Sequence, residues 1–155
     1  MINIIDANNL AGKLGLLREE NFDEKLIELL GQYKKSKYIL VFDGRDNMGD
    51  KYTRENITVI YTPRDNFYKS ADDKIVELAS QYLNSGEGAK IITNDLEIIS
   101  KVEKIINDQG GKIVFEKATS FAEKLNNYLE NKQEEKGLTE TEADKINQDL
   151  LKVWK

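Results

Sequence analysis

Short apolar runs alternate with longer amphipathic segments along this chain, and that alternation most constrains its fold. Such runs are typical of strands buried on both faces of a parallel sheet. The amphipathic segments between them form the helical crossovers that cover the two faces. Strands are expected at residues 2–5, 38–42, 57–61, 89–93 and 112–115, and helices at residues 23–35, 71–84, 96–108 and 121–129. We therefore predict an α/β protein with a three-layer α/β/α architecture and a mostly parallel sheet of about five strands.

Two stretches between these elements carry no clear periodicity. Residues 9–21 read as a loop or an irregular helical turn, and the Gly-, Asp- and Asn-rich residues 44–56 as a flexible loop. The chain closes with a further amphipathic helix at residues 138–155, which begins at a capping box of Thr139 and Glu142. Its apolar stripe, suited to docking, consists of Ile146, Leu150 and Val153 or Trp154. We predict a main domain at residues 1–130, and a charged linker with the C-terminal helix at residues 131–155.

The chain has the length of one domain and can bury a substantial core, with 155 residues. It has no apolar run of about 18 residues, so no membrane span is expected. The sequence opens directly on a predicted strand, which leaves no room for a signal peptide. There are no cysteines, so no disulfide partner is expected, and we predict a cytoplasmic protein.

The residue types that are missing restrict the chemistry. With no histidine and no cysteine, the chain cannot form a Ser-His-Asp triad, a cysteine nucleophile or an ordinary zinc site. An enzyme of this composition must use carboxylates, Lys, Arg, Tyr or a hard metal ion, and oxygen ligands favour Mg²⁺ or Mn²⁺. The net charge of −5 argues against nucleic-acid binding through overall charge. It leaves open a local basic groove.

Five aspartates stand where predicted strands end or where the next helix begins. Asp6, Asp43 and Asp95 each follow an apolar run, and Asp72 with Asp73 begins the helix after the third strand. In a parallel sheet these positions all lie along the carboxyl edge, where ligands bind in open α/β sheets. Carboxylates so close together repel one another unless a cation neutralises them or a proton is shared. A divalent metal is the usual solution, and it can activate water and stabilise charge on a phosphodiester.

Each aspartate also has a purely structural interpretation. Asp43 begins a common Asp-Gly turn, Asp73 fits a helix start, and Asp95 can cap the helix that follows it. Asp6 is the exception, because it interrupts an apolar run and has no evident capping role. The coincidence of all these acids at one edge favours a functional site more strongly than any single residue does.

Four short motifs follow one another along the chain in a characteristic order. They are IIDANNL at residues 4–10, VFDG at 41–44, SADDKIVELA at 70–79 and ITND at 92–95. The first resembles the IxDGxN opening of NYN domains, which are ribonuclease domains of the PIN-like superfamily. The others resemble the second strand, the acidic helix start and the T-S-D motif of the YacP-like branch, and residues 138–154 resemble its helical tail. The resemblance covers nearly the whole chain.

This resemblance implies a PIN-like fold and the cleavage of RNA with Mg²⁺ or Mn²⁺. Matched position by position, the expected catalytic acids are Asp6, Asp72, Asp73 and Asp95, and Asp6, Asp72 and Asp95 among them would bind the metal.

Three further residues are expected to support the metal ligands. Asn9 matches the asparagine of the opening motif and would orient Asp6. Asp43 and Asn94 would contact the metal ligands without binding the metal themselves. The sequence departs from the family pattern at Ala7, where Gly is usual, and at Asn94, where Ser is common. Both departures concern fine geometry rather than the site itself.

RNA is the expected partner, with mRNA as the predicted substrate and presentation by the ribosome as an open alternative. Residues 44–69 are slightly basic in an acidic chain, and aromatic rings are interleaved with their charges. Lys and Arg can hold phosphates, while aromatic rings can stack on unpaired bases. The other interpretation is a solvated loop whose rings pack on the core. The expected RNA-binding residues are Lys13, Arg45, Lys51, Arg54, Arg64, Lys69, Tyr52 and Tyr68.

The leading hypothesis is a metal-dependent endoribonuclease that uses carboxylate-bound Mg²⁺ or Mn²⁺ and activated water. A non-catalytic RNA- or ribosome-binding module with the same fold is the main alternative, and it would be marked by loss of an acid, which has not occurred here. Receiver domains and haloacid-dehalogenase-like phosphatases fit poorly, because Asp6 is followed by Ala7 and Asn8 rather than by another acid. Structure-specific DNA nucleases usually carry more acids and further DNA-binding elements.

Overall fold

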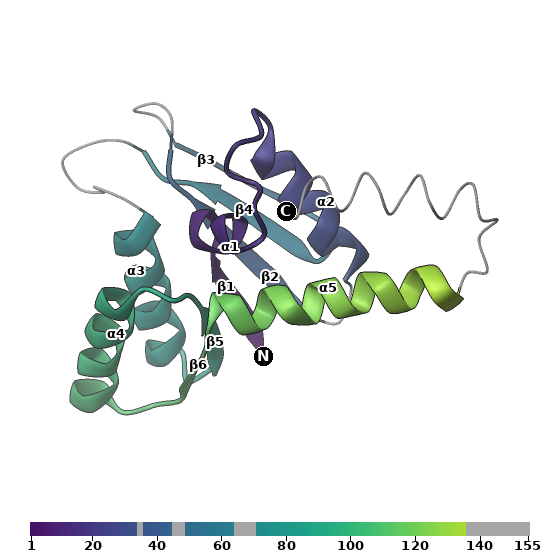
Figure 1. Ribbon diagram of the computed structural model, residues 1–155. Helices are drawn as coiled ribbons and strands as arrows, with labels where there is room; N and C mark the ends of the chain where they lie inside the picture. Colours follow the sequence, from purple (N-terminus) through teal and green to yellow (C-terminus); the bar gives the residue numbers. More distant parts are fainter. Residues whose placement is uncertain (34–35, 45–48, 64–70, 136–155) are drawn as a thin grey trace.

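The computed structural model describes residues 1–33, 36–44, 49–63 and 71–135. These segments form a single sheet with helices on both faces (Figure 1). The elements are β1 (Ile2–Asp6), α1 (Ala7–Lys13), α2 (Phe22–Gln32), β2 (Tyr38–Phe42), β3 (Asp50–Arg54), β4 (Ile57–Tyr61), α3 (Ala71–Asn84), β5 (Ala89–Ile92), α4 (Leu96–Gln109), β6 (Ile113–Glu116) and α5 (Ala118–Glu135).

The sheet has six strands in the order β3-β4-β2-β1-β5-β6. All neighbouring pairs are parallel except β3 and β4, which are antiparallel. β1 lies at the centre, between β2 and β5, so its carboxyl end is flanked by the ends of two parallel neighbours. The predicted α/β class and the mostly parallel sheet are confirmed, with one strand more than expected.

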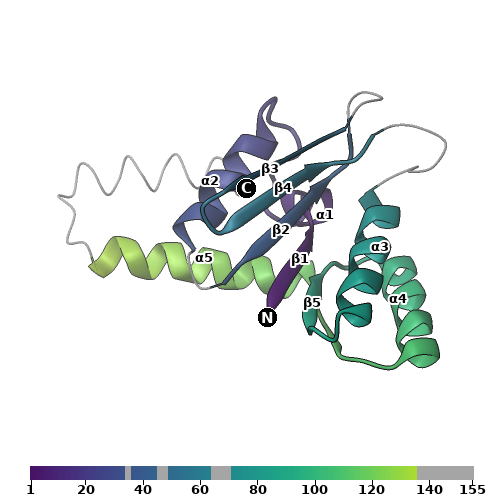
Figure 2. The same cartoon turned by 180° about the vertical axis from the view of Figure 1, so that it is seen from behind.

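Two apolar layers hold the helices to the sheet. Successive residues of a strand point to opposite faces, and Ile4 and Ile5 are both fully buried because each face is covered. Ile5 packs with α1, α2 and α5, whereas Ile4 packs with α3 and α4. Figures 1 and 2 show the two groups of helices from opposite sides. The structure is therefore the predicted three-layer α/β/α sandwich, consistent with a PIN-like fold.

β3 was not expected, since its residues fall in the segment predicted to be a flexible loop. All five of its residues are exposed, so the strand has no apolar face that could show as a periodicity in the sequence. It forms through pairing with β4, across a turn in which Glu55 has φ 55° and the Thr53 and Thr58 hydroxyls lie 3.2 Å apart. The prediction of a loop over residues 44–56 was wrong for this part.

The starts and ends of several helices also differ from the prediction. α1 begins directly after Asp6, where a loop or irregular turn was expected from residue 9. α2 begins after Asn21 and ends at Gln32, so Asp23 does not cap it. Asp23 instead accepts a hydrogen bond of 2.8 Å from the Tyr61 hydroxyl, a contact across 38 positions of the chain. The division at residue 130 stays a prediction, since residues 136–155 lie outside the described residues.

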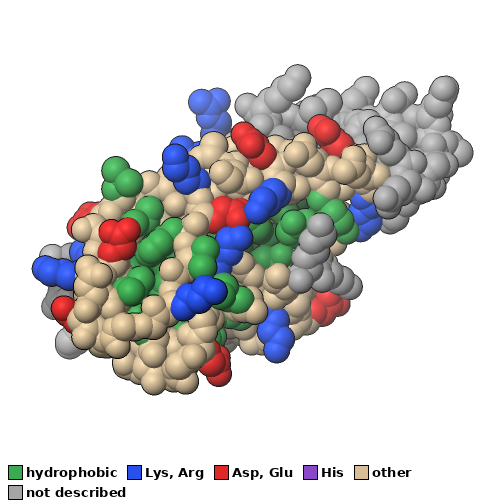
Figure 3. Space-filling view, turned by 90° about the horizontal axis from the view of Figure 1, so that it is seen from below, with side chains coloured by type: hydrophobic (Ala, Val, Ile, Leu, Met, Phe, Trp, Pro, Cys, Tyr) green, Lys and Arg blue, Asp and Glu red, His purple; other side chains and the backbone are tan. Residues whose placement is uncertain are grey.

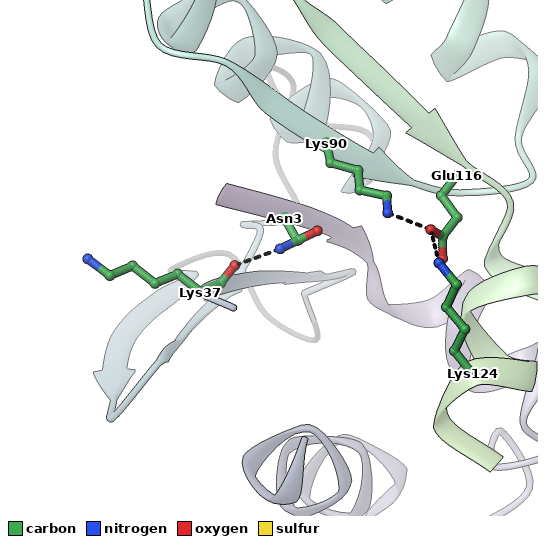
Figure 4. A network of polar contacts seen from close by, with 5 residues as sticks. All are labelled: Asn3, Lys37, Lys90, Glu116 and Lys124. Carbon is green, nitrogen blue, oxygen red and sulfur yellow. Dashed lines mark hydrogen bonds and ion pairs between the residues drawn. The ribbon is translucent and has the colours of Figure 1, made fainter. Parts of the chain in front are cut away.

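A partly exposed ion network ties α5 to the edge of the sheet. Glu116 at the end of β6 accepts hydrogen bonds from Lys90 of β5 and Lys124 of α5, both at Oε1 (Figure 4). Burial opposes the charge on Glu116, but the two ammonium groups outweigh it and lower the pKa of the carboxyl. Beside this network, the Asn3 amide donates to the Lys37 carbonyl at 3.2 Å.

The end of the molecule opposite the carboxyl edge has a mixed surface. Seen from below, Lys and Arg side chains are interspersed with Asp and Glu and with patches of hydrophobic side chains (Figure 3). Among the described residues, no helix has the length and apolar character needed to cross a membrane.

Candidate metal centre

Asp6 lies at the carboxyl end of the central strand and is almost completely buried, with 6% of its surface exposed. It occupies the N-cap position of α1, but its side chain makes no capping hydrogen bond there. Its Oδ2 atom instead accepts a hydrogen bond of 3.0 Å from the hydroxyl of Thr93, which follows β5. Thr93 thus links the Asp6 carboxyl to the segment that leads into α4.

The environment of Asp6 opposes its negative charge. Burial is the main reason why its pKa is raised from 3.8 to about 6, and the charges of Asp43 and Asp95 act in the same direction. The Thr93 hydrogen bond and the backbone N–H of Asn9 oppose this rise only in part. A buried carboxyl with such a pKa is typical of a functional site.

Three other acids gather beside it at the same edge. One carboxylate oxygen from each of Asp72, Asp95 and Glu97 lies within 4.8 Å of the other two. Asp72 comes from the first turn of α3, Asp95 is the N-cap of α4, and Glu97 lies in the first turn of α4. Asp95 Oδ1 accepts from the Glu97 backbone N–H at 2.9 Å, and Glu97 Oε1 pairs with Lys101 at 3.3 Å.

Asp72 shows the electrostatic consequence of this crowding. Burial raises its pKa from 3.8 to about 6, and the negative charges of Asp6 and Asp95 reinforce the effect. The contact of its side chain with that of Asp95 raises the pKa further. The geometry thus places Asp6, Asp72 and Asp95 close enough for each negative charge to disfavour the others.

The side chains of Asn9 and Asn94 make hydrogen bonds around the loop that carries Asp95, and their supporting role toward the metal ligands stays a prediction. Asn9 Oδ1 accepts from the Asn94 N–H at 3.0 Å, which ties α1 to the loop that carries Asp95. The Asn94 side chain in turn donates to Thr119 Oγ1 at 2.8 Å and accepts from the Thr119 N–H at 3.3 Å. This chain of contacts fixes the Asp95 loop between the first helix and the last.

Asp43 has a similar supporting position on the other side. Its Oδ1 accepts from the Ala71 N–H at 2.6 Å, so it caps the helix that carries Asp72 from 28 positions away. The N–H of Asp43 donates to Asn8 Oδ1 at 3.1 Å. Asp43 thus orients Asp72 through its helix and also contributes charge to the cluster.

The structure does not bring every predicted residue to this edge. Asp73 lies in the first turn of α3 but is not part of the group formed by Asp72, Asp95 and Glu97. Lys13 is exposed at the far end of α1. Both remain predictions as functional residues.

The expected RNA-binding residues on β3 do not share one surface, because Lys51 and Arg54 lie on opposite faces of the sheet. Lys51 lines a hollow between β3, β4 and α3, whereas Arg54 lines another between α2 and α5. Tyr52 is exposed between them on β3, and Arg54 pairs with the amino end of β4, away from the acids. Arg45, Arg64, Lys69 and Tyr68 lie outside the described residues.

Two members of the site were missed from the sequence. Glu97 stands two residues after Asp95 in the first turn of a helix, a spacing that brings both carboxylates to one helix end and was a usable signal. Thr93 had no such signal. Its hydroxyl donates to Asp6 and accepts from the Asp95 N–H at 3.0 Å, and these partners meet only in the folded chain.

The donor set fits a hard divalent cation. All the converging atoms are carboxylate oxygens, which suit Mg²⁺, Mn²⁺ or Ca²⁺ rather than softer metals. Burial and the neighbouring acids raise the pKa values of Asp6 and Asp72, and a bound cation would offset the same negative charges. Asp72, Asp95 and Glu97 would hold the ion, with Asp6 beside them.

The comparison with known proteins agrees with this geometry. A family model described as the YacP-like NYN domain matches residues 3–155. Neither a curated protein nor a solved structure matches the chain significantly. NYN domains form part of a nuclease-like superfamily, and the acidic cluster found here is compatible with metal binding. The chain belongs to the YacP-like NYN domain family.

Proposed function

We propose that this protein is a metal-dependent endoribonuclease that hydrolyses phosphodiester bonds within RNA. The observation that carries the proposal is the convergence of the Asp72, Asp95 and Glu97 oxygens within 4.8 Å, next to buried Asp6, in a chain of a nuclease-like family. RNA as the substrate is supported by the family, and mRNA, free or presented by the ribosome, remains part of the proposal.

Mg²⁺ or Mn²⁺ at these acids would lower the pKa of a water molecule and neutralise charge that develops on the phosphodiester. The chain's own residues supply the placement. Thr93 holds the Asp6 carboxyl through Oδ2 and so orients it beside the other acids. Asp95 caps α4 with Oδ1, and its Oδ2 would be the oxygen offered to the cation. Asn9 and Asn94 hold the Asp95 loop, and they prevent the acids from moving apart to relieve their repulsion.

The direct test is cleavage of a mixed pool of structured and single-stranded RNAs in the presence of Mn²⁺, Mg²⁺ or EDTA. Asp6→Asn and Asp95→Asn would be assayed beside wild type. Asp108→Asn makes the same chemical change on an exposed acid at the other end of α4 and is the matched control. We expect metal-dependent cleavage by wild type and the control, and none by the two site variants while their folding is retained.

Cleavage that survives both site substitutions, or EDTA, would mean that the acids are not the active site. A folded wild type that binds Mn²⁺ and RNA but cleaves nothing would instead favour the non-catalytic binding module. The same assay with purified ribosomes added separates this outcome from a requirement for presentation of the substrate.

A further inference from the structure

Leu96 is the most exposed large hydrophobic residue in the described part of the chain, at 79%. It is the first residue of α4 and stands directly between Asp95 and Glu97. Consecutive Cα atoms are only about 3.8 Å apart. An apolar side chain therefore protrudes from the rim of the acidic cluster.

The fold itself does not require a leucine here. The buried face of α4 is formed by Ile98 and Val102, with Ile106 packed partly against the same cluster. Each residue of an α-helix is rotated by about 100° from the last, so Leu96 points about 160° away from Ile98. Capping of α4 is performed by Asp95 and does not involve its neighbour's side chain. Single exposed leucines are common, but this one lies between two candidate metal ligands.

We infer that Leu96 is a substrate contact, which packs against a nucleoside next to the phosphate held at the acidic cluster and so favours unpaired RNA. This inference rests on the proposed function. A phosphodiester held by a cation at Asp95 and Glu97 would bring an adjoining nucleoside near the residue between them. The acids around Leu96 offer no attraction to further phosphates, so an apolar surface is the complementary one at this point.

The chemistry of RNA then specifies the kind of substrate. Its main apolar surfaces are the faces of the bases, and in a duplex these are covered by stacking on their neighbours. Only an unpaired or unstacked nucleotide can offer a base face to a side chain. Aromatic side chains of other proteins that bind single strands stack on such exposed faces. Partial covering of one leucine is expected to strengthen binding about 5- to 30-fold.

The test is a coupling experiment between the protein and the RNA. The probe is a fluorescein-labelled single-stranded RNA of mixed sequence, about 12 nucleotides long, and a series in which one nucleotide at a time is abasic. Binding is measured by anisotropy in Ca²⁺ for wild type, Leu96→Ala and Val114→Ala. Val114 is the control, because it is an exposed apolar residue on β6.

We expect Leu96→Ala to weaken binding about 5- to 30-fold, with unchanged thermal stability and unchanged Mn²⁺ affinity by calorimetry. At one position of the RNA, removal of the base should weaken binding to wild type by a similar factor. The same abasic RNA should bind to Leu96→Ala no more weakly than the intact RNA does. Val114→Ala should bind like wild type.

Three outcomes would overturn the inference. First, Leu96→Ala could bind the RNA as tightly as wild type. Second, the loss of affinity from Leu96→Ala could add fully to the loss from every abasic position. Third, Leu96→Ala could weaken binding to a duplex of the same sequence by the same factor. If wild type binds and cleaves RNA while any of these holds, only the inference on Leu96 fails. If wild type neither binds nor cleaves any RNA, the proposed function fails, and the inference fails with it.

Discussion

The hydroxyl of Thr93 donates a hydrogen bond of 3.0 Å to Oδ2 of Asp6, from a position 87 residues further along the chain. The hydroxyl oxygen of Thr93 also accepts a hydrogen bond of 3.0 Å from the backbone N–H of Asp95. One buried hydroxyl, 1% exposed, therefore links two acids of the candidate metal centre and uses both its donor and an acceptor site.

Replacing Thr93 by valine should destabilise the protein by about 1–3 kcal/mol, because the Asp6 carboxyl and the Asp95 N–H both lose a buried partner. It should also weaken Mn²⁺ binding. Urea unfolding at pH 7.5 in EDTA measures the first effect and calorimetry the second. Thr93→Ser keeps the hydroxyl and is the control, so equal stability of the two variants would contradict this role.

Asp6→Asn should make the metal-free protein more stable at pH 7.5, by about 1–3 kcal/mol. The pKa of Asp6 is raised from 3.8 in the unfolded chain to about 6 in the folded one, so folding is favoured by protonation. The contribution of Asp6 to the free energy of unfolding therefore falls as the pH rises from about 4 to about 6, and asparagine removes this penalty. The advantage of the variant should shrink towards pH 4, and an equal advantage at both pH values would contradict the argument. Thermal unfolding in EDTA across this range is the measurement.

Divalent metal should stabilise wild type, and the effect should depend on pH. Mn²⁺ at about 100 times its dissociation constant should add about 2.7 kcal/mol to the free energy of unfolding. Asp6 and Asp72 both have pKa values near 6, so protons should compete with the metal and affinity should fall below that pH.

The melting temperature with and without Mn²⁺, at pH 5 and pH 7.5, reports this competition. Asp72→Asn should lose most of the shift, while Asp108→Asn on the exposed end of α4 should keep it. An undiminished shift in Asp72→Asn would exclude that residue as a ligand.

Glu116→Gln should destabilise the protein by about 1–3 kcal/mol, because the Lys90 and Lys124 ammonium groups lose their common carboxylate. The pKa of Glu116 is lowered from 4.5, so its contribution is fully present above that pH and is lost as the pH falls through the folded value. Urea unfolding at pH 7 and at acidic pH should show that the difference in the free energy of unfolding between wild type and Glu116→Gln is smaller at acidic pH. Glu123→Gln, an exposed acid on the same helix, should change stability by no more than about 0.5 kcal/mol.

Gly44→Ala should be severely destabilising, by more than about 3 kcal/mol. A Cβ atom at residue 44 would lie 1.5 Å from the backbone oxygen of Thr62, and the Thr62 backbone is held beside β2 by a 3.0 Å hydrogen bond from its N–H to the Phe42 carbonyl. Gly31→Ala is the matched control, because its Cβ would meet nothing within 4 Å and alanine is the better helix former. Thermal melts of the two variants should therefore differ clearly, and a Gly44→Ala protein as stable as wild type would show that the Thr62 backbone can give way.

The alternation of apolar runs with amphipathic segments was sufficient to predict the α/β class, the three layers and the mostly parallel sheet. The runs that became β1, β2, β4 and β5 are buried on both faces, and such burial leaves a continuous apolar signal in the sequence. β3 left no such signal because it is exposed on both faces and exists only through pairing with β4.

The sequence by itself determined that Asp6, Asp72 and Asp95 would share one edge of the sheet, because parallel strands all end on the same side. Only the tertiary structure decided how these acids are held. Thr93 reaches Asp6, Asp43 caps the helix of Asp72, and Glu97 rather than Asp73 joins the cluster. Periodicity reports which face of an element is buried, whereas a hydrogen bond between residues far apart in the chain depends on ångström-scale placement that no local pattern records.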